Sequence, residues 1–281
     1  MMKLQTSVTL ETAPVAISYS DRILVLGSCF ADEIGQRLAC AGFRVLCNPF
    51  GTLYNPVSVG NALARLSSGV PFTEEDTVEM GAGAGRVCSF WHHTSFARET
   101  AEEFLANANK SLEEAVSFWK ECNRVIVTLG TAWAFRRNDT GETVANCLKR
   151  PAAEFTRYRL TVAQVSAILQ GLVKRNPGKE FIFTVSPIRH LADGAHGNQL
   201  SKSTLLLATE GLPYFPAYEI MRDELRDYRW WAEDMVHPTK QAAAYLCDRF
   251  IEWALPVREW DLYESRMKEW RCRQHRPNYS E

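Results

Sequence analysis

Short apolar runs punctuate the chain and predict its strands. Four of them, each followed by turn or polar residues, occupy residues 23–26, 43–46, 124–129 and 181–185. Uninterrupted runs of this length, with many β-branched side chains, are typical of strands buried on both faces of a parallel sheet. A fifth strand is predicted at residues 212–215, where Pro213 and Pro216 favour a position at the edge of the sheet.

Between these runs the apolar residues recur at helical spacing. The helical patterns cover residues 31–41, 101–120, 161–173, 217–228 and 238–254. Thr161 and Gln164 fit a capping box at the start of the third pattern, and Pro238 is predicted at the first position of the last. Because strands and helices alternate, we expect a three-layer α/β fold in which helices cover both faces of a short parallel sheet.

Two segments depart from this alternation. Residues 67–96 fall between the second and third strands, and they predict an elaborated excursion with a small hairpin. Residues 256–281 predict a C-terminal helical extension, because apolar side chains recur at helical spacing at Trp260, Tyr263, Met267 and Trp270. This helix packs either on the body of the protein or on another subunit of a homo-oligomer. The sequence contains no repeat or low-complexity linker, so a single domain is predicted for residues 1–281.

Charge and cysteine content narrow the classes of partner. The chain has 32 basic and 33 acidic residues, so it lacks the basic excess that nucleic-acid binding requires. Its basic cluster is predicted to be a solvated tail and comprises Arg271, Arg273, His275 and Arg276. Eight scattered cysteines without a C-x-x-C pair are typical of reduced thiols and predict a cytoplasmic protein. Neither a membrane span of ~20 apolar residues nor a signal peptide is expected, and a membrane partner is therefore not predicted.

The first strand ends in a turn that carries a hydroxyl and a thiol. This turn reads Gly-Ser-Cys-Phe-Ala over residues 27–31, and a helix is predicted to begin at its end. The free N–H groups at a helix N-terminus stabilise a thiolate or an oxyanion, so Ser28 and Cys29 are candidate nucleophiles. The alternative is structural: Ser28 caps the helix and Cys29 is a small buried apolar side chain. Taken alone, this segment favours the structural alternative.

A second candidate lies near the end of the chain, where Asp234 and His237 are three residues apart. A carboxylate at this spacing can accept a hydrogen bond from one ring nitrogen and leave the other free to take a proton. The structural alternative is that Asp234 caps the following helix and His237 packs at its start. The spacing alone is weak, because Asp193 and His196 share it.

These two features, in this order and at opposite ends of the chain, resemble the SGNH-hydrolase superfamily. The turn at residues 27–31, followed by Asn-Pro-Phe-Gly-Thr-Leu-Tyr-Asn-Pro at residues 48–56, more closely resembles the GSCFA-domain family. Shorter stretches that also resemble this family lie at residues 91–93, 129–133, 186–190 and 214–219. The resemblance spans most of the chain and implies an SGNH-hydrolase or flavodoxin-like sheet. It also implies an acyl esterase or acyltransferase, with no cofactor, that acts on a small-molecule or carbohydrate acyl substrate.

The resemblance also implies the roles of site residues. The superfamily turn is Gly-Asp-Ser, and in register Cys29 stands where the serine does, which favours a Cys29–His237–Asp234 triad and leaves Ser28 as the alternative nucleophile. The oxyanion hole is implied to use the backbone N–H groups of the nucleophile and of Gly51, which follows the second strand.

One expected oxyanion donor is missing from the sequence. The superfamily has Gly-x-Asn-Asp after the third strand, whereas this chain has Gly-Thr-Ala-Trp from Gly130, so Gly130 and Thr131 stand at that part of the oxyanion hole. Thr131, Asn146 or His93 is a candidate to replace the absent asparagine. Loss of one such donor can cost about 2.7–4 kcal/mol of transition-state stabilisation. The missing donor supports a competing hypothesis, a non-catalytic carbohydrate- or ligand-binding module on a degenerate hydrolase fold.

Further polar residues are predicted to line the substrate site. They are Asn48, His92, His93, Asn146, Arg189 and His190. Arg189 and His190 follow the fourth strand, where ligands bind in open α/β sheets, and are candidates to bind an anionic or sugar group. No spacing among the histidines is diagnostic of a metal site, so no metal is predicted. The charged run at residues 222–227 is predicted to be the solvated face of a helix.

Overall fold

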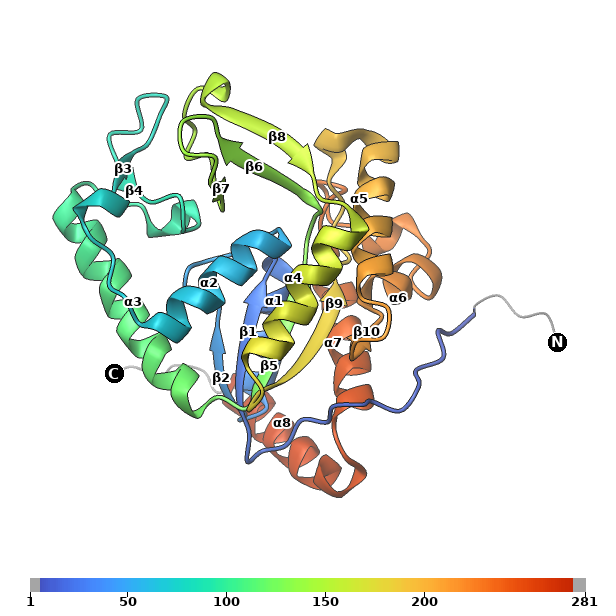
Figure 1. The fold of residues 1–281 in the computed structure, drawn as a ribbon. Coiled ribbons are helices and arrows are strands. Elements are labelled where there is room, and N and C mark those ends of the chain that lie inside the picture. The colour runs from blue at the N-terminus through green and yellow to red at the C-terminus, as the bar shows by residue number, and fades with distance from the viewer. Residues whose placement is uncertain (1–5, 275–281) are drawn as a thin grey trace, which may run out of the picture.

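The computed structural model describes residues 6–274 and has a five-stranded parallel sheet at its centre (Figure 1). In sheet order the strands are β10 (Tyr214–Phe215), β9 (Glu180–Val185), β5 (Arg124–Leu129), β1 (Arg22–Gly27) and β2 (Arg44–Cys47). All five predicted strands are confirmed, and β10 lies at an edge as its prolines predict. Counted from the β2 edge, the strands follow the chain order second, first, third, fourth and fifth. This is the flavodoxin-like order, with its switch point between β1 and β5.

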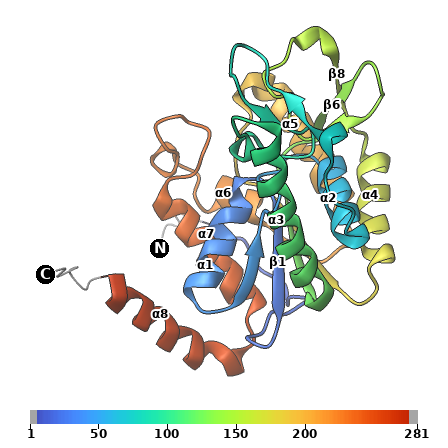
Figure 2. The ribbon, with the colours of Figure 1, turned by 90° about the vertical axis from the view of Figure 1, so that its left-hand side faces the viewer.

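Helices cover both faces of the sheet, and each face has its own apolar core (Figures 1 and 2). One face packs against α1 (Cys29–Cys40), α6 (Ala217–Asp223), α7 (Lys240–Ala254) and α8 (Trp260–Gln274). The other packs against α2 (Pro56–Ser68), α3 (Ala101–Glu121), α4 (Val162–Arg175) and α5 (Gly194–Ala208). Alternate strand residues point to opposite faces, so Ile23 and Val25 join the first core while Leu24 and Leu26 join the second. The predicted three-layer α/β fold is confirmed.

A second, smaller layer lies beyond the carboxyl ends of the central strands (Figure 1). The predicted excursion contains the hairpin of β3 (Val78–Glu79) and β4 (Val87–Cys88), so the small hairpin is confirmed. An unpredicted antiparallel sheet consists of β6 (Trp133–Arg137), β7 (Thr143–Val144) and β8 (Phe155–Arg159). Its strands are charged and largely solvent-accessible, which gives no continuous apolar run to detect.

Helix boundaries match the sequence patterns in most places. The capping box at Thr161 and Gln164 is present, and the C-terminal helix α8 packs on the body through Tyr263 and Met267. The prediction for Pro238 is wrong: α7 begins at Lys240 with Thr239 as its N-cap. The helix predicted to reach residue 228 ends at Asp223 as α6. Helices α2 and α5 were not predicted.

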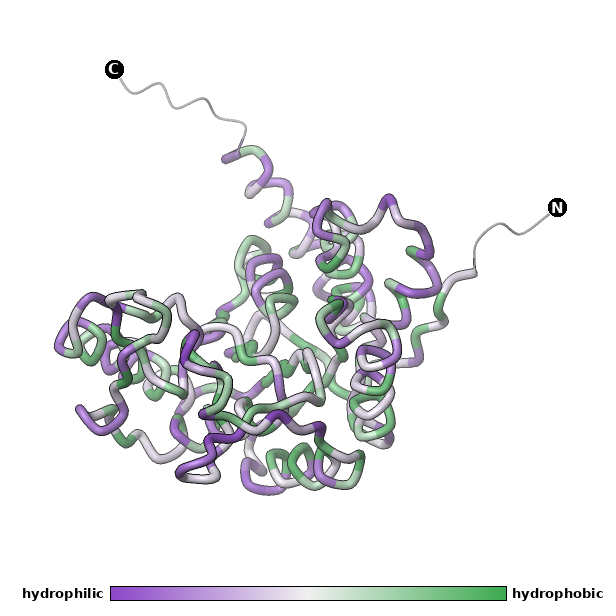
Figure 3. Tube along the Cα trace, turned by 90° about the horizontal axis from the view of Figure 1, so that it is seen from above, coloured by the Kyte–Doolittle hydropathy of each residue, from purple (hydrophilic) through white to green (hydrophobic). Residues whose placement is uncertain are grey.

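Six 3₁₀ turns complete the description of these residues: η1 (Glu74–Asp76), η2 (Thr94–Phe96), η3 (Ala152–Glu154), η4 (Leu191–Asp193), η5 (Tyr228–Trp230) and η6 (Val257–Glu259). Seen from above, hydrophobic residues gather on the inner sides of the layers while hydrophilic residues follow the outer loops and helix faces (Figure 3). Over residues 6–274, no helix is long and apolar enough to cross a membrane. Of the basic cluster, His275 and Arg276 lie outside the described residues.

Candidate functional site

The turn after β1 is fixed by close backbone contacts to β5 and to the loop after β2. Gly27 has φ 131°, and a Cβ there would lie 2.1 Å from the Thr128 carbonyl oxygen, so no other residue fits without a shift. The Gly27 carbonyl accepts from the N–H of Leu53 at 2.7 Å, and the Ser28 N–H donates to the Thr128 carbonyl at 3.0 Å. The N-terminus of α1 is thereby held at the carboxyl edge of the sheet, where ligands bind in this fold class.

Ser28 has the structural role that its sequence alternative predicts. It is the N-cap of α1: its Oγ accepts from the Phe30 N–H at 3.4 Å. The same Oγ lies 3.0 Å from Thr128 Oγ1, and Ser28 is only 1% exposed. With its hydroxyl buried and bonded on both sides, Ser28 is poorly placed to attack a substrate, and Cys29 is left as the more accessible candidate.

Cys29 is the first residue of α1 and is partly exposed. The pKa of its thiol is raised to about 11, mainly by burial and to a smaller extent by the nearby carboxylates of Asp32 and Glu33. The backbone N–H of Cys29 and the ammonium of Lys202 act in the opposite direction but do not prevail. The thiol is therefore protonated at neutral pH, so a nucleophilic role requires a base to take its proton.

Asn48 supports this turn from the next loop. Its Oδ1 accepts from the Gly27 N–H at 2.9 Å, and its Nδ2 donates to Asp32 Oδ1 at 2.8 Å. Asn48 is 8% exposed and has φ 42°, a left-handed conformation that asparagine tolerates. Because both ends of the amide bind within the chain, the structure corrects the predicted substrate contact: Asn48 positions the turn and Asp32.

Lys202, on α5, ties the third and fourth central strands together and was missed by the sequence reasoning. Its Nζ donates to the Gly130 carbonyl at 2.7 Å and to the Ser186 carbonyl at 2.8 Å, just beyond the ends of β5 and β9. Lys202 is 1% exposed, and burial lowers its pKa to about 7. A signal was present in the sequence, since Lys202 shares a helical stripe with the buried Leu205 and so lies on the apolar side of α5.

The Asp234–His237 pair is hydrogen-bonded as its spacing predicts. His237 Nδ1 lies 2.6 Å from Asp234 Oδ2, and Asp234 Oδ1 accepts from the N–H groups of Val236 and His237 at 2.9 and 3.0 Å. These hydrogen bonds lower the pKa of Asp234 to about 2, so it is a carboxylate at neutral pH. Asp234 does not cap α7, whose N-cap is Thr239.

The same sequence spacing does not produce a second pair. Asp193 forms an ion pair with Arg157 instead of bonding His196. His196 is exposed at the start of α5. The local turn around Asp234, in which Met235 has φ 55°, therefore distinguishes the two pairs.

The segment with Arg189 and His190, after β9, lies between the Lys202 side of the site and the His237 loop. The Arg189 N–H donates to the Val236 carbonyl at 3.0 Å, which anchors the His237 loop to the segment that follows β9. The pKa of His190 is lowered to about 4, mainly by burial, with smaller contributions from the positive charge of Lys202 and from His237. Cys29, Lys202, His190 and His237 thus occupy one edge of the sheet. Among the described residues, however, no hydrogen bond joins Cys29 or Ser28 to His237.

The backbone donors predicted for the oxyanion hole are already engaged within the chain. The Gly51 N–H donates to the Asn48 carbonyl at 2.8 Å, and the N–H groups of Gly130 and Thr131 both donate to the Tyr54 carbonyl at 2.9 Å. The Thr131 hydroxyl bonds Ser201 Oγ at 2.9 Å. For the Cys29 N–H, at the first turn of α1, no acceptor is described between residues 6 and 274.

The four remaining predicted substrate residues lie in different places. His92 is fully buried, bonds Ser89 Oγ at 2.6 Å and packs among phenylalanines, so the prediction that it contacts substrate is wrong. Asn146 lies beyond β7, where its Oδ1 accepts from the Leu148 N–H at 2.8 Å. His93 lies against Gly51, and its Nδ1 bonds Ser95 Oγ at 3.1 Å. Arg189 borders a pocket beside the His237 loop.

Within the described residues, no three His, Cys, Asp or Glu side chains gather in a way that could hold a metal ion.

Comparison with known proteins adds one positive finding. A sequence model described as the GSCFA family matches residues 22–250, from β1 into α7. No curated protein matches the chain.

Proposed function

Since the chain belongs to the GSCFA family, we propose that it is an SGNH-like acyl esterase or acyltransferase acting on a small acylated molecule, such as an acylated carbohydrate. The observation that carries the proposal is the Asp234–His237 pair, whose carboxylate orients the ring through Nδ1 and leaves Nε2 available at the edge of the sheet that holds Cys29. The flavodoxin-like strand order, with the turn after β1, supports the superfamily placement.

Cys29 is the proposed nucleophile. Its thiol is partly exposed at the N-terminus of a twelve-residue helix, whereas the neighbouring Ser28 hydroxyl is buried and bonded. The backbone N–H of Cys29 lowers the pKa of its own thiol, and it is the donor we assign to the oxyanion. Lys202 is a positioning residue that fixes the ends of β5 and β9 around this turn.

The proposed reaction has two balanced halves. His237 Nε2 takes the proton from the Cys29 thiol as the sulfur attacks the acyl carbon; substrate binding has to bring these two groups together, directly or through a water. The tetrahedral intermediate collapses to a thioester on Cys29, and the leaving alkoxide takes the proton from His237. Water or an acceptor alcohol then attacks the thioester, its proton passes through His237, and the thiol is restored.

A second candidate is a ligand-binding module that kept the fold and lost the reaction. Two observations favour it: the raised pKa of Cys29, and the engagement of the Gly51, Gly130 and Thr131 N–H groups within the chain. Such a module would bind an acylated ligand without forming a thioester.

Acyl-enzyme formation distinguishes these candidates. The purified protein is incubated with p-nitrophenyl acetate, and the position of the acetyl group is followed by intact mass and peptide mapping. We expect Cys29 to be acetylated faster than the exposed Cys272, and this advantage to disappear in His237→Ala. His196→Ala is the matched control, because it removes the other exposed histidine that follows an aspartate by three residues.

Acetylation of Cys29 at the rate of Cys272, unchanged by His237→Ala, would remove the support for a triad and leave the binding module. Loss of reactivity in both histidine variants would point to a general structural effect and also count against the specific role of His237.

A further inference from the structure

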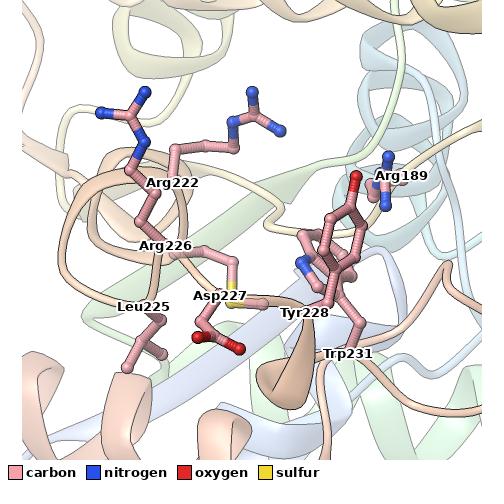
Figure 4. A pocket seen from close by; sticks show the side chains of 8 residues that line it. Arg189, Arg222, Leu225, Arg226, Asp227, Tyr228 and Trp231 are labelled. Atoms are coloured by element: carbon pink, nitrogen blue, oxygen red, sulfur yellow. The ribbon is translucent and has the colours of Figure 1, made fainter.

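A pocket of about 270 Å³ opens beside the His237 loop (Figure 4). It lies between the segment after β9, the end of α6 with the turn that follows, and η5. Its lining includes Arg189, Arg222, Arg226, Asp227, Tyr228 and Trp231. Figure 4 shows Arg222 and Arg226 extending from the α6 side, with Arg189, Tyr228 and Trp231 bordering the other side. Three positively charged side chains therefore line one small pocket.

The positive charge of this pocket is not neutralised by its own lining. Over residues 6–274, Arg189, Arg222 and Arg226 form no described ion pair. Asp227, the acidic residue of the lining, is bonded by Arg229, through the guanidinium at 3.0 Å and the N–H at 2.9 Å. Guanidinium groups without an ion-pair partner that line one cavity favour an anion, since arginine binds carboxylate and phosphate oxygens with charge-assisted hydrogen bonds.

One side of the pocket is held in place before any ligand binds. The Arg189 guanidinium carbon lies 4.9 Å from the centre of the Trp231 ring, and its Nη1 donates to the Met235 carbonyl at 3.4 Å. Trp231 is itself fixed by an N–H bond to the Tyr228 carbonyl at 3.0 Å and by a bridge to Pro238. A positioned arginine loses less conformational freedom on binding than a free one, which favours affinity.

The pocket and the acyl site share a loop. The Arg189 N–H bonds the Val236 carbonyl, next to His237, and His190 follows Arg189 in the chain. An anionic group bound by the three arginines would therefore lie next to the Asp234–His237 pair. The chemistry of the pocket and its place together suggest that it holds a part of the substrate that does not react.

We propose that Arg189, Arg222 and Arg226 form a subsite for a phosphate group, so that the acyl substrate is a phosphorylated small molecule. A phosphate dianion offers three acceptor oxygens and two negative charges to three guanidinium groups, which a single carboxylate does not. The proposal that phosphate binds here depends only on the pocket. The proposal that this phosphate belongs to an acyl substrate rests on the proposed function.

Direct binding tests the subsite without requiring turnover. Inorganic phosphate, ADP and glucose 6-phosphate are titrated by calorimetry at about pH 8, where phosphate is largely a dianion, at constant ionic strength. Acetate serves as the monoanionic probe. We expect phosphate-bearing probes to bind and the double variant Arg222→Gln/Arg226→Gln to weaken them at least about tenfold, or about 1.4 kcal/mol. Arg44→Gln/Arg86→Gln, which removes two exposed arginines outside the pocket lining, should bind as the wild type does.

Comparison of the probes also identifies the source of the phosphate. Tighter binding of an organic phosphate than of inorganic phosphate would support a substrate subsite, while equal binding would assign the pocket to free phosphate and overturn the substrate part. Equal affinity of acetate and phosphate, or unchanged binding in Arg222→Gln/Arg226→Gln, would refute the subsite. Cys29→Ala should retain phosphate binding, so a failure of the acyl-transfer proposal is distinguishable from a failure of this one.

Discussion

Replacement of Lys202 by methionine tests whether this buried lysine has the pKa that its surroundings impose. Methionine fills a similar volume without the amine, and it leaves the Gly130 and Ser186 carbonyls without their shared donor. Each buried carbonyl left unsatisfied costs about 1–3 kcal/mol. This loss does not depend on pH, whereas the titration of Lys202 itself does.

The sign of the pH dependence follows from the two pKa values. Burial lowers the folded-state pKa of Lys202 to about 7, while an unfolded lysine titrates near 10.5. Between these values the unfolded chain binds a proton that the folded chain does not, so the wild type gains stability as pH rises; below about 7 the cost of burying the charge applies in full. From about pH 7.5 to about pH 9, the free energy of unfolding should rise by about 2 kcal/mol in the wild type relative to Lys202→Met.

Urea unfolding followed by tryptophan fluorescence measures this difference, with reducing agent present and linear extrapolation to water. The comparison has to be between two proteins, because buried thiols oppose the effect: burial raises the pKa of Cys247 to about 12, which lowers stability as pH rises above 9. Lys174→Met, an exposed lysine of α4, is the matched control and should show no pH-dependent difference. A difference between wild type and Lys202→Met that stays constant or shrinks with rising pH would refute the reasoning.

Three further predictions address single residues. Ser28→Ala should lose about 2 kcal/mol of stability, about half from the helix cap and half from the bond to Thr128, yet still acetylate Cys29; peptide mapping that finds the wild-type acetyl group on Ser28 would contradict this. Asp234→Asn should slow acetylation of Cys29 by at least about 10²-fold with unchanged unfolding, because the ring loses the carboxylate that orients it; single-turnover kinetics measure the rate, and a wild-type rate would exclude the pair. His92→Phe should leave acetylation intact. Because burial lowers the pKa of His92 to about 3, while an unfolded histidine titrates near 6.5, the wild type should lose about 1.6 kcal/mol more than the variant between about pH 6.5 and about pH 5; parallel losses in urea unfolding would place His92 in a solvated site.

Local features of the sequence predicted much of the sheet and part of the site. Apolar runs predicted four of the five central strands, because a strand buried on both faces is mostly apolar. The prolines around β10 predicted an edge, since proline cannot donate to a neighbouring strand. The spacing of Asp234 and His237 predicted their hydrogen bond, which forms within a single turn.

Contacts between distant segments decided the rest. Arg222 and Arg226, in the charged run at residues 222–227, are exposed as the pattern predicts. They also line a pocket, because Arg189, more than thirty residues earlier in the sequence, approaches from the segment after β9. His92 is of a residue type that often binds ligands, yet phenylalanines from α3, from the loop after β2 and from the loop after α2 enclose its ring.

The same distinction applies within the turn after β1. Its sequence offers two candidate nucleophiles, Ser28 and Cys29. The choice between them depends on Thr128, one hundred residues away, whose hydroxyl is hydrogen-bonded to that of Ser28. By itself the sequence determined the five central strands, most of the helices that cover them and where the carboxyl edge of the sheet lies, because those depend on neighbours in the chain. Only the tertiary structure decided which polar groups are already satisfied, because burial and hydrogen bonding are set by residues that the fold brings together from opposite ends of the chain.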